Sequence, residues 1–233
     1  MKPVISVNGN ELGLLSSVTY VLEKIIDMST LPEDENNSTH WHKAHYSVEH
    51  PQIWDKYIVF HRDAYIDGIG ASMLRYGWIN QQMNFLGLKT LKIYIYRPIL
   101  ETDVCKTSGV NIYNEDGSLF YSSDKFPLRI KDIITDLSWE GTILSYDKPL
   151  DHRSGYQGCM VLTYLTASVE GDFFSLLFGY GINNSGNVSR TTDLAGLGGG
   201  GVYGNDIGCI VAYAPDCYPQ WVNNNTMQRS VLP

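Results

Sequence analysis

Four histidines form the densest group of potential metal ligands in the sequence: His40, His42, His45 and His50. Neutral imidazole is the commonest metal donor in proteins, and His40 and His42, two residues apart, would lie on the same face of a strand. A structural zinc site normally has four ligands, often thiolates, and all four cysteines lie far away in sequence. We therefore assign no metal or cofactor and expect solvated or interfacial histidines, with a transition-metal site at a junction between subunits as the alternative.

Carboxylate pairs are the other side chains with catalytic potential: Asp147 with Asp151, and Glu170 with Asp172. A glycosidase needs two carboxylates at a set separation in a cleft, which spacing along the chain does not establish. The sequence has no G-x-S-x-G nucleophile elbow. The glycine-rich residues 196–204 lack the Lys-Ser/Thr pair of a phosphate-binding loop and predict a flexible loop. We therefore expect a non-enzymatic protein without catalytic residues, and hydrolysis of a cell-envelope polysaccharide is the enzymatic alternative.

The charge distribution argues against nucleic-acid binding. The chain has 17 basic and 25 acidic residues and a net charge of −8, whereas proteins that neutralise phosphates usually carry a basic stripe. Lys89, Lys92 and Arg97 come nearest to a cluster, but they alternate with apolar residues. Such alternation predicts the solvent-facing side of a strand, so we expect no nucleic-acid partner.

The elements that must position these residues are strands. Glycine and tyrosine are frequent, with 22 and 16 copies, and only 18% of the residues are charged. Short apolar runs bounded by Gly, Asn and Asp recur along the second half, as in β-sandwiches and barrels. We expect an all-β protein, built as an antiparallel β-sandwich or barrel-like domain or domains, with long loops and little helix.

The clearest half-buried strand lies within residues 88–100 and ends at Pro98. Its positions alternate in polarity, with Leu91, Ile93 and Ile95 on one face and Lys92, Tyr94 and Tyr96 on the other. Polar segments predict long loops at residues 29–52 and 181–206.

A boundary near residues 101–106 would divide the chain into two β domains. Residues 1–104 would form the N-terminal domain with its His-rich loop, and residues 105–233 the C-terminal domain. One continuous domain is the alternative, because no Gly/Ser linker marks the boundary.

The four cysteines are widely spaced, form no C-x-x-C pair and accompany no secretion signal. We therefore expect reduced, largely buried thiols at Cys105, Cys159, Cys209 and Cys217. No apolar run approaches the roughly 20 residues that span a bilayer, so we expect a soluble protein without a membrane span.

Residues 108–130 predict a β-hairpin, because both the strand residues and the turn residues between them fit one. Val110 and Ile112 precede the turn Asn114-Glu115-Asp116-Gly117, and the β-forming residues 119–121 follow it. Asn and Gly adopt the turn conformations that most residues resist.

The order G-V-x-I-Y-N-x-x-G-x-L-x-x-S-S-x-x-x-P-L-R-I, which begins at Gly109, resembles a segment of small tail-tip-associated proteins of tailed bacteriophages and prophages. The resemblance covers about 25 of the 233 residues and contains no catalytic group. It implies a structural protein of the virion tail, synthesised in the host cytoplasm, that assembles with other tail proteins and as a homo-oligomer or symmetric assembly. A host surface receptor is a possible further partner.

A tip protein that binds a host receptor or a glycan is the non-enzymatic alternative. Tyr and Trp side chains in the predicted loops would suit protein interfaces and also sugar stacking. They are Trp41, Tyr46, Trp54, Tyr156, Tyr203, Tyr218 and Trp221.

Overall fold

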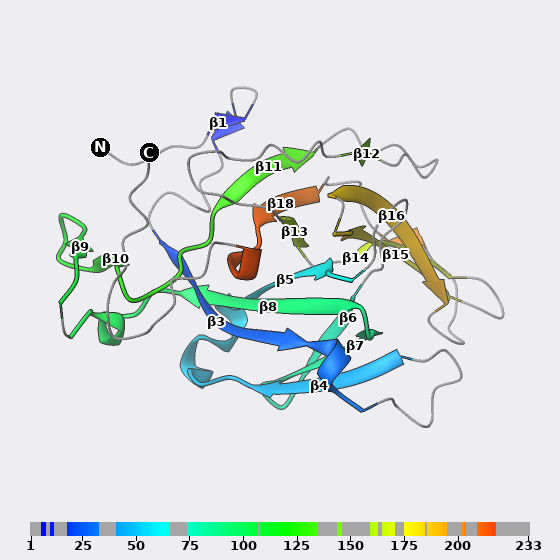
Figure 1. The fold of residues 1–233 in the computed structure, drawn as a ribbon, viewed down its shortest axis with the longest axis horizontal. Helices are drawn as coiled ribbons and strands as arrows, with labels where there is room; N and C mark the ends of the chain where they lie inside the picture. The colour runs from blue at the N-terminus through cyan, green and yellow to red at the C-terminus, as the bar shows by residue number, and fades with distance from the viewer. Residues whose placement is uncertain are drawn as a thin grey trace.

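A computed structural model of the chain shows a protein built from antiparallel sheets (Figure 1). The structure describes residues 6–7, 10–11, 18–32, 41–65, 74–106, 108–134, 144–145, 159–162, 165–170, 175–184, 186–194, 202–203 and 209–217. These residues contain strands and short 3-10 helices but no α-helix. The predicted all-β class is therefore confirmed.

A six-stranded sheet forms the centre of the molecule, and each strand is antiparallel to its neighbours. Its strand order is β11 (Ile130–Ile134), β18 (Cys209–Tyr213), β13 (Cys159–Leu162), β5 (Ile58–Asp63), β8 (Leu91–Pro98) and β3 (Tyr20–Asp27). Strand β13 pairs with β5 through Val161 and His61. The sheet thus includes strands from both sides of the expected boundary at residue 104.

Two smaller sheets pack on one face of the central sheet. The three-stranded sheet β4 (Trp41–Ser47), β7 (Gln82–Leu88) and β6 (Arg75–Ile79) covers β8 and β5, with Met83 and Phe85 packed against Ile93 and Ile95. The five-stranded sheet lies against β13 and β18, where Ile182 packs near Val161. Its strand order is β12 (Leu144–Ser145), β16 (Asn187–Leu194), β15 (Ser175–Ile182), β14 (Leu165–Glu170) and β17 (Val202–Tyr203).

The opposite face of the central sheet holds a second apolar cluster. Phe60, Tyr94 and Tyr96 pack there with Met160 and Ala212. Strand β8 is therefore buried on both faces, and the prediction of a half-buried strand is wrong in this respect. Residues of β8 do alternate in polarity, as predicted. The face with Tyr94 and Tyr96 is nevertheless buried, because their aromatic rings supply apolar area despite the hydroxyl groups.

The remaining elements are short. They are the strand pairs β1 (Ser6–Val7) with β2 (Asn10–Glu11) and β9 (Asn111–Tyr113) with β10 (Leu119–Ser122), and the 3-10 helices η1 (Met28–Thr30), η2 (Pro51–Lys56), η3 (Glu101–Asp103) and η4 (Pro215–Cys217).

Two segments predicted as loops contain strands. Strand β4 lies within residues 29–52, and β16 lies within residues 181–206. In β4, buried His42 and Ala44 alternate with exposed Lys43 and His45. The strand was missed because its buried positions include a histidine and an alanine, so pairing with β7, not local hydrophobicity, specifies it.

Within the described residues, no helix has the length and apolar composition needed to cross a bilayer.

Candidate functional site

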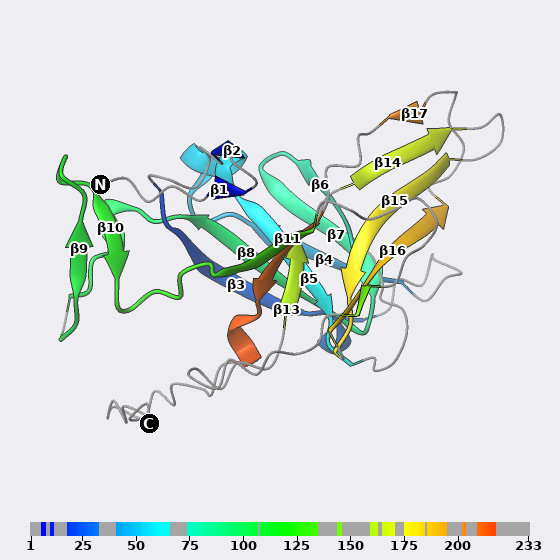
Figure 2. The same ribbon diagram turned by 90° about the horizontal axis from the view of Figure 1, so that it is seen from above.

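The predicted hairpin at residues 108–130 is confirmed, and it projects from one end of the molecule. Strands β9 and β10 form a two-stranded sheet of their own, which Figure 2 shows at the far end from β14–β17. The Asn114 N–H donates to the Ser118 carbonyl over 2.8 Å and the Gly117 N–H donates to the Asn114 carbonyl over 3.0 Å. Gly117 has a φ of 83°, which explains why the turn requires glycine.

One side of the hairpin is anchored to the body. Leu119 is buried against Val21 and Ile99, and its N–H donates to the Glu101 carboxylate over 2.8 Å. The chain before β9 is also tied down, because Asn111 hydrogen-bonds both backbone groups of Cys105. These contacts hold the hairpin in one orientation relative to the central sheet.

The rest of the hairpin exposes apolar side chains. Val110 and Ile112 are 57% and 48% exposed, and they lie on the same face because they are two residues apart in an extended segment. Tyr113 and Phe126 are also about half exposed. Among the described residues, no third strand pairs with either edge of β9–β10. An anchored element with exposed apolar groups and open edges is typical of a protein-interaction site.

A buried ion network lies at the root of this hairpin. Arg97 donates two hydrogen bonds to Asp103, over 2.6 and 2.9 Å, and also pairs with Glu23. Lys125, which follows β10, lies 3.0 Å from the Asp103 carboxylate. Arg97 is only 3% exposed, so the prediction that it faces solvent is wrong. Strand alternation places Arg97 on the same face as Ile93 and Ile95, and exposure was expected only because the residue is charged.

The network shifts the pKa values of Asp103 and of neighbouring Tyr57. Burial alone would raise the pKa of the Asp103 carboxyl, but hydrogen bonds from Arg97 and the Leu100 N–H outweigh burial and hold that pKa well below its ordinary value. Burial and the Glu23 carboxylate raise the pKa of the Tyr57 hydroxyl. Asp103 is therefore charged and Tyr57 neutral at pH 7.

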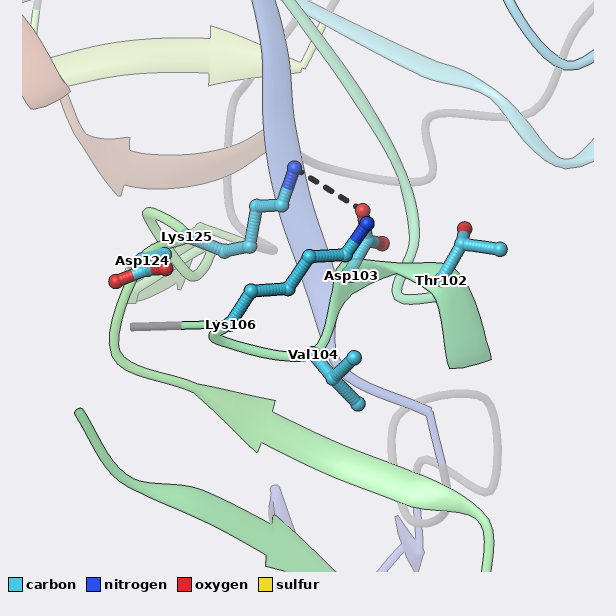
Figure 3. A pocket seen from close by; sticks show the side chains of 6 residues that line it. All are labelled: Thr102, Asp103, Val104, Lys106, Asp124 and Lys125. Atoms are coloured by element: carbon cyan, nitrogen blue, oxygen red, sulfur yellow. Dashed lines mark ion pairs between the residues drawn. The ribbon is translucent and has the colours of Figure 1, made fainter. Parts of the chain in front are cut away.

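A shallow hollow of about 220 Å³ lies beside this network (Figure 3). It is lined by Thr102, Asp103, Val104, Lys106, Asp124 and Lys125. Opposite charges alternate around it, and Figure 3 shows Lys125 reaching across to Asp103. The two acidic and two basic side chains that line the hollow balance in charge, and we interpret it as part of the hairpin's base.

The structure describes three histidines of the His-rich segment: it places His42 and His45 on opposite faces of β4, and His50 beyond that strand, directly before η2. His42 is 4% exposed, and its Nδ1 atom lies 2.9 Å from the Leu31 carbonyl oxygen. His45 is exposed on the other face of β4, with its Nδ1 atom 2.5 Å from Asn84 Oδ1. Residues on opposite faces of a strand cannot ligate one ion. Within the described residues no group of three or more potential ligands is close enough to hold a metal, and His40 lies outside them.

Other predicted candidates fall mainly outside the described residues. These are Asp147, Asp151 and Asp172 among the carboxylates, the aromatic residues Tyr156, Tyr218 and Trp221, and the glycine-rich residues except Val202–Tyr203 of β17. Glu170 is the last residue of β14.

A second buried polar cluster lies on the tyrosine face of the central sheet. Asp216 of η4 accepts hydrogen bonds from Lys92 and Tyr94 over 3.0 and 2.8 Å, and Arg62 donates to the Cys217 sulfur. Burial raises the pKa of the Cys217 thiol to about 11, so it stays protonated at neutral pH and is a weak nucleophile. The cluster fastens η4 to the sheet, and the spacing of these residues in sequence gave no sign of it.

Comparisons of the chain with protein-family models, with curated proteins and with solved structures found no match.

Proposed function

We propose that the protein is a non-enzymatic structural subunit of a bacteriophage virion, located in or near the tail tip, that binds neighbouring tail proteins through the β9–β10 hairpin. The observation that carries this proposal is the combination of a firmly anchored hairpin root with an exposed apolar face at Val110 and Ile112. The phage setting rests on the resemblance of residues 109–130 to tail-tip-associated proteins.

The mechanism is docking of a preformed element. Leu119 and the Asp103 network hold the hairpin before a partner arrives, so little conformational entropy is lost on binding. A partner strand would add to an open edge of β9–β10 and satisfy backbone groups there, while its side chains cover Val110 and Ile112. Repetition around a symmetric assembly would multiply these modest contacts.

Quantitative mass spectrometry of purified phage particles tests the proposed role. Particles from cells that produce the phage encoding this chain should contain the chain in a fixed ratio to the other tail proteins. Its absence from purified particles would contradict the virion role.

A variant pair tests the hairpin separately. Ile112→Lys places a charge on the exposed face, where it is compatible with folding but not with an apolar interface, and should lower incorporation at least tenfold. Val18→Lys is the matched control, because Val18 is also apolar and 40% exposed but lies outside the hairpin. Equal incorporation of both variants would show that the hairpin is not the docking element.

A further inference from the structure

A surface-exposed tryptophan lies away from the β9–β10 hairpin and is not explained by the proposed assembly role. Trp54 of η2 is 41% exposed. Its ring contacts that of Trp78 of β6 edge to face, with centroids 5.4 Å apart and planes at 71°. The β6–β7 hairpin and β9–β10 are well separated in both Figure 1 and Figure 2.

The Trp54 ring is supported by other aromatic side chains. Trp78 also contacts the Tyr57 ring edge to face, at 6.3 Å. The Tyr57 hydroxyl donates to both Glu23 oxygens, over 2.9 and 3.0 Å, and Glu23 pairs with Arg97. Ring contacts and hydrogen bonds thus connect exposed Trp54 through half-buried Trp78 to buried Tyr57 and Glu23, and they order the aromatic platform before any ligand binds, which is the preorganisation that a binding site needs.

The turn next to Trp78 is made of two amide residues with positive φ, a backbone conformation that is unfavourable for the second of them. Asn80 and Gln81 join β6 to β7 with φ values of 50° and 63°, the pattern of a type I′ turn in which glycine is strongly preferred at the second position. Asn tolerates this region, whereas Gln has no such preference. Gln81 at a position where glycine would fit better makes this turn a candidate functional position.

The exposed aromatic area is too small for a stable protein interface. Trp54 is 41% exposed, and a tryptophan side chain has at most about 250 Å² of surface, so Trp54 offers on the order of 100 Å² to a partner. The one large apolar side chain of the β6–β7 hairpin that is exposed among the described residues is Ile79. A standard protein interface needs about 800 Å² per partner. One or two sugar rings, in contrast, match the area of an indole and present hydroxyls that amides bind.

We propose that Trp54 and the Asn80-Gln81 turn form a binding site for a neutral carbohydrate. Trp54 stacks on the C–H face of a pyranose ring, and the amides of the turn hydrogen-bond its hydroxyl groups. The turn begins two residues after Trp78, whose ring contacts that of Trp54, so Trp54 and the two amides belong to the same end of the β6–β7 hairpin. The site lies apart from the proposed docking hairpin, although the Glu23–Arg97 pair supports both.

Titration with oligosaccharides tests the proposal on the full-length protein. The probes are cellotetraose, maltotetraose, mannotetraose and chitotetraose, each to 10 mM, followed by ¹H–¹⁵N NMR of the Trp indole and Asn/Gln side-chain signals. At least one probe should shift the Trp54 and Gln81 signals in a saturable way. Trp54→Ala should weaken that binding at least tenfold, and Trp54→Phe should restore part of it.

Two further variants separate sugar binding from folding. Gln81→Gly should weaken binding several-fold yet raise Tm by about 2 to 4 °C, since it relieves the turn. Tyr113→Ala removes an aromatic side chain of similar exposure on the other hairpin and should leave binding unchanged. No saturable shift with any probe would overturn the proposal. So would a Trp54→Ala variant that loses only incorporation into particles, because that result would assign the surface to a protein partner.

Discussion

Arg97 and Asp103 show how one ion pair can organise the base of a projecting hairpin. Both side chains are almost fully buried, and their paired hydrogen bonds are joined by Glu23 on one side and Lys125 on the other. Burying such charges is costly unless every group finds a partner. The network therefore contributes more to the defined orientation of the hairpin than to net stability, and removal of a single member should be strongly destabilising.

Asp103→Asn should lower the free energy of unfolding by about 3 kcal/mol at pH 7, because it removes the carboxylate that pairs with buried Arg97 and with Lys125, and leaves Arg97 with Glu23 alone. The pKa of Asp103 is lowered in the folded protein. Its contribution is therefore present above the unfolded pKa of about 3.9 and is lost as the pH falls below that value. Urea denaturation at pH 7, 4 and 3 should show the difference between wild type and variant shrinking as the pH falls.

Asp124→Asn is the matched control for this experiment. Asp124 lines the same hollow but is exposed, so its replacement should change stability by less than about 0.5 kcal/mol. An Asp103→Asn defect that stays constant down to pH 3 would contradict the assigned role of the carboxylate.

At the scale of elements, the two hairpins illustrate different uses of the left-handed conformation. In β9–β10 it is taken by Gly117, with no strain, and the hairpin offers apolar side chains. In β6–β7 it is taken by Asn80 and Gln81, and the hairpin offers amides. A turn made from glycine serves stability alone, whereas a turn made from larger residues keeps polar side chains at a defined place.

Gly117→Ala should destabilise the β9–β10 hairpin by about 1 kcal/mol, because alanine resists a positive φ. Gly77→Ala is a close control: a Cβ atom at either glycine would meet nothing within 4 Å, but only Gly117 has a positive φ. Gly77→Ala should be neutral or slightly stabilising. Amide exchange in β9–β10 should accelerate only in the first variant, and equal acceleration in both would show that backbone conformation is not the cause.

For the whole molecule, the central sheet joins the two halves of the chain. The core between the central sheet and β4, β6 and β7 comes entirely from the first half, but on the tyrosine face of the sheet Phe60, Tyr94 and Tyr96 pack with residues of the second half, including Met160, Ala212 and Ala214. Asp216 reinforces this union through Lys92 and Tyr94.

A fragment of residues 1–104 should therefore be poorly folded or aggregate. It would expose Phe60, Tyr94 and Tyr96, each worth roughly 1.5 to 3 kcal/mol of burial, and it would open the edge of β5 to other chains. Binding of the dye ANS and sedimentation velocity should show exposed apolar surface and association. A monomeric fragment that unfolds cooperatively near the Tm of the full chain would instead identify residues 1–104 as an independent domain.

The amino-acid sequence by itself was sufficient for the all-β class, the hairpin around Asn114 and Gly117, and the end of β8 at Pro98. These features depend on interactions between residues close together in the chain: turn conformations, strand periodicity and the missing N–H of proline. Such signals can be recognised without knowing which distant residues pack against the segment.

Other features could be known only once distant strands lay side by side. The pairing of Arg97 with Glu23, the burial of the tyrosine face of β8, and the strands β4 and β16 in polar segments all depend on residues far along the chain. Trp54 was a candidate from sequence, but its support by Trp78 and Tyr57 was not visible there. The physical reason is that burial is a property of the assembled layers, and a residue's local pattern specifies its face but not what covers that face.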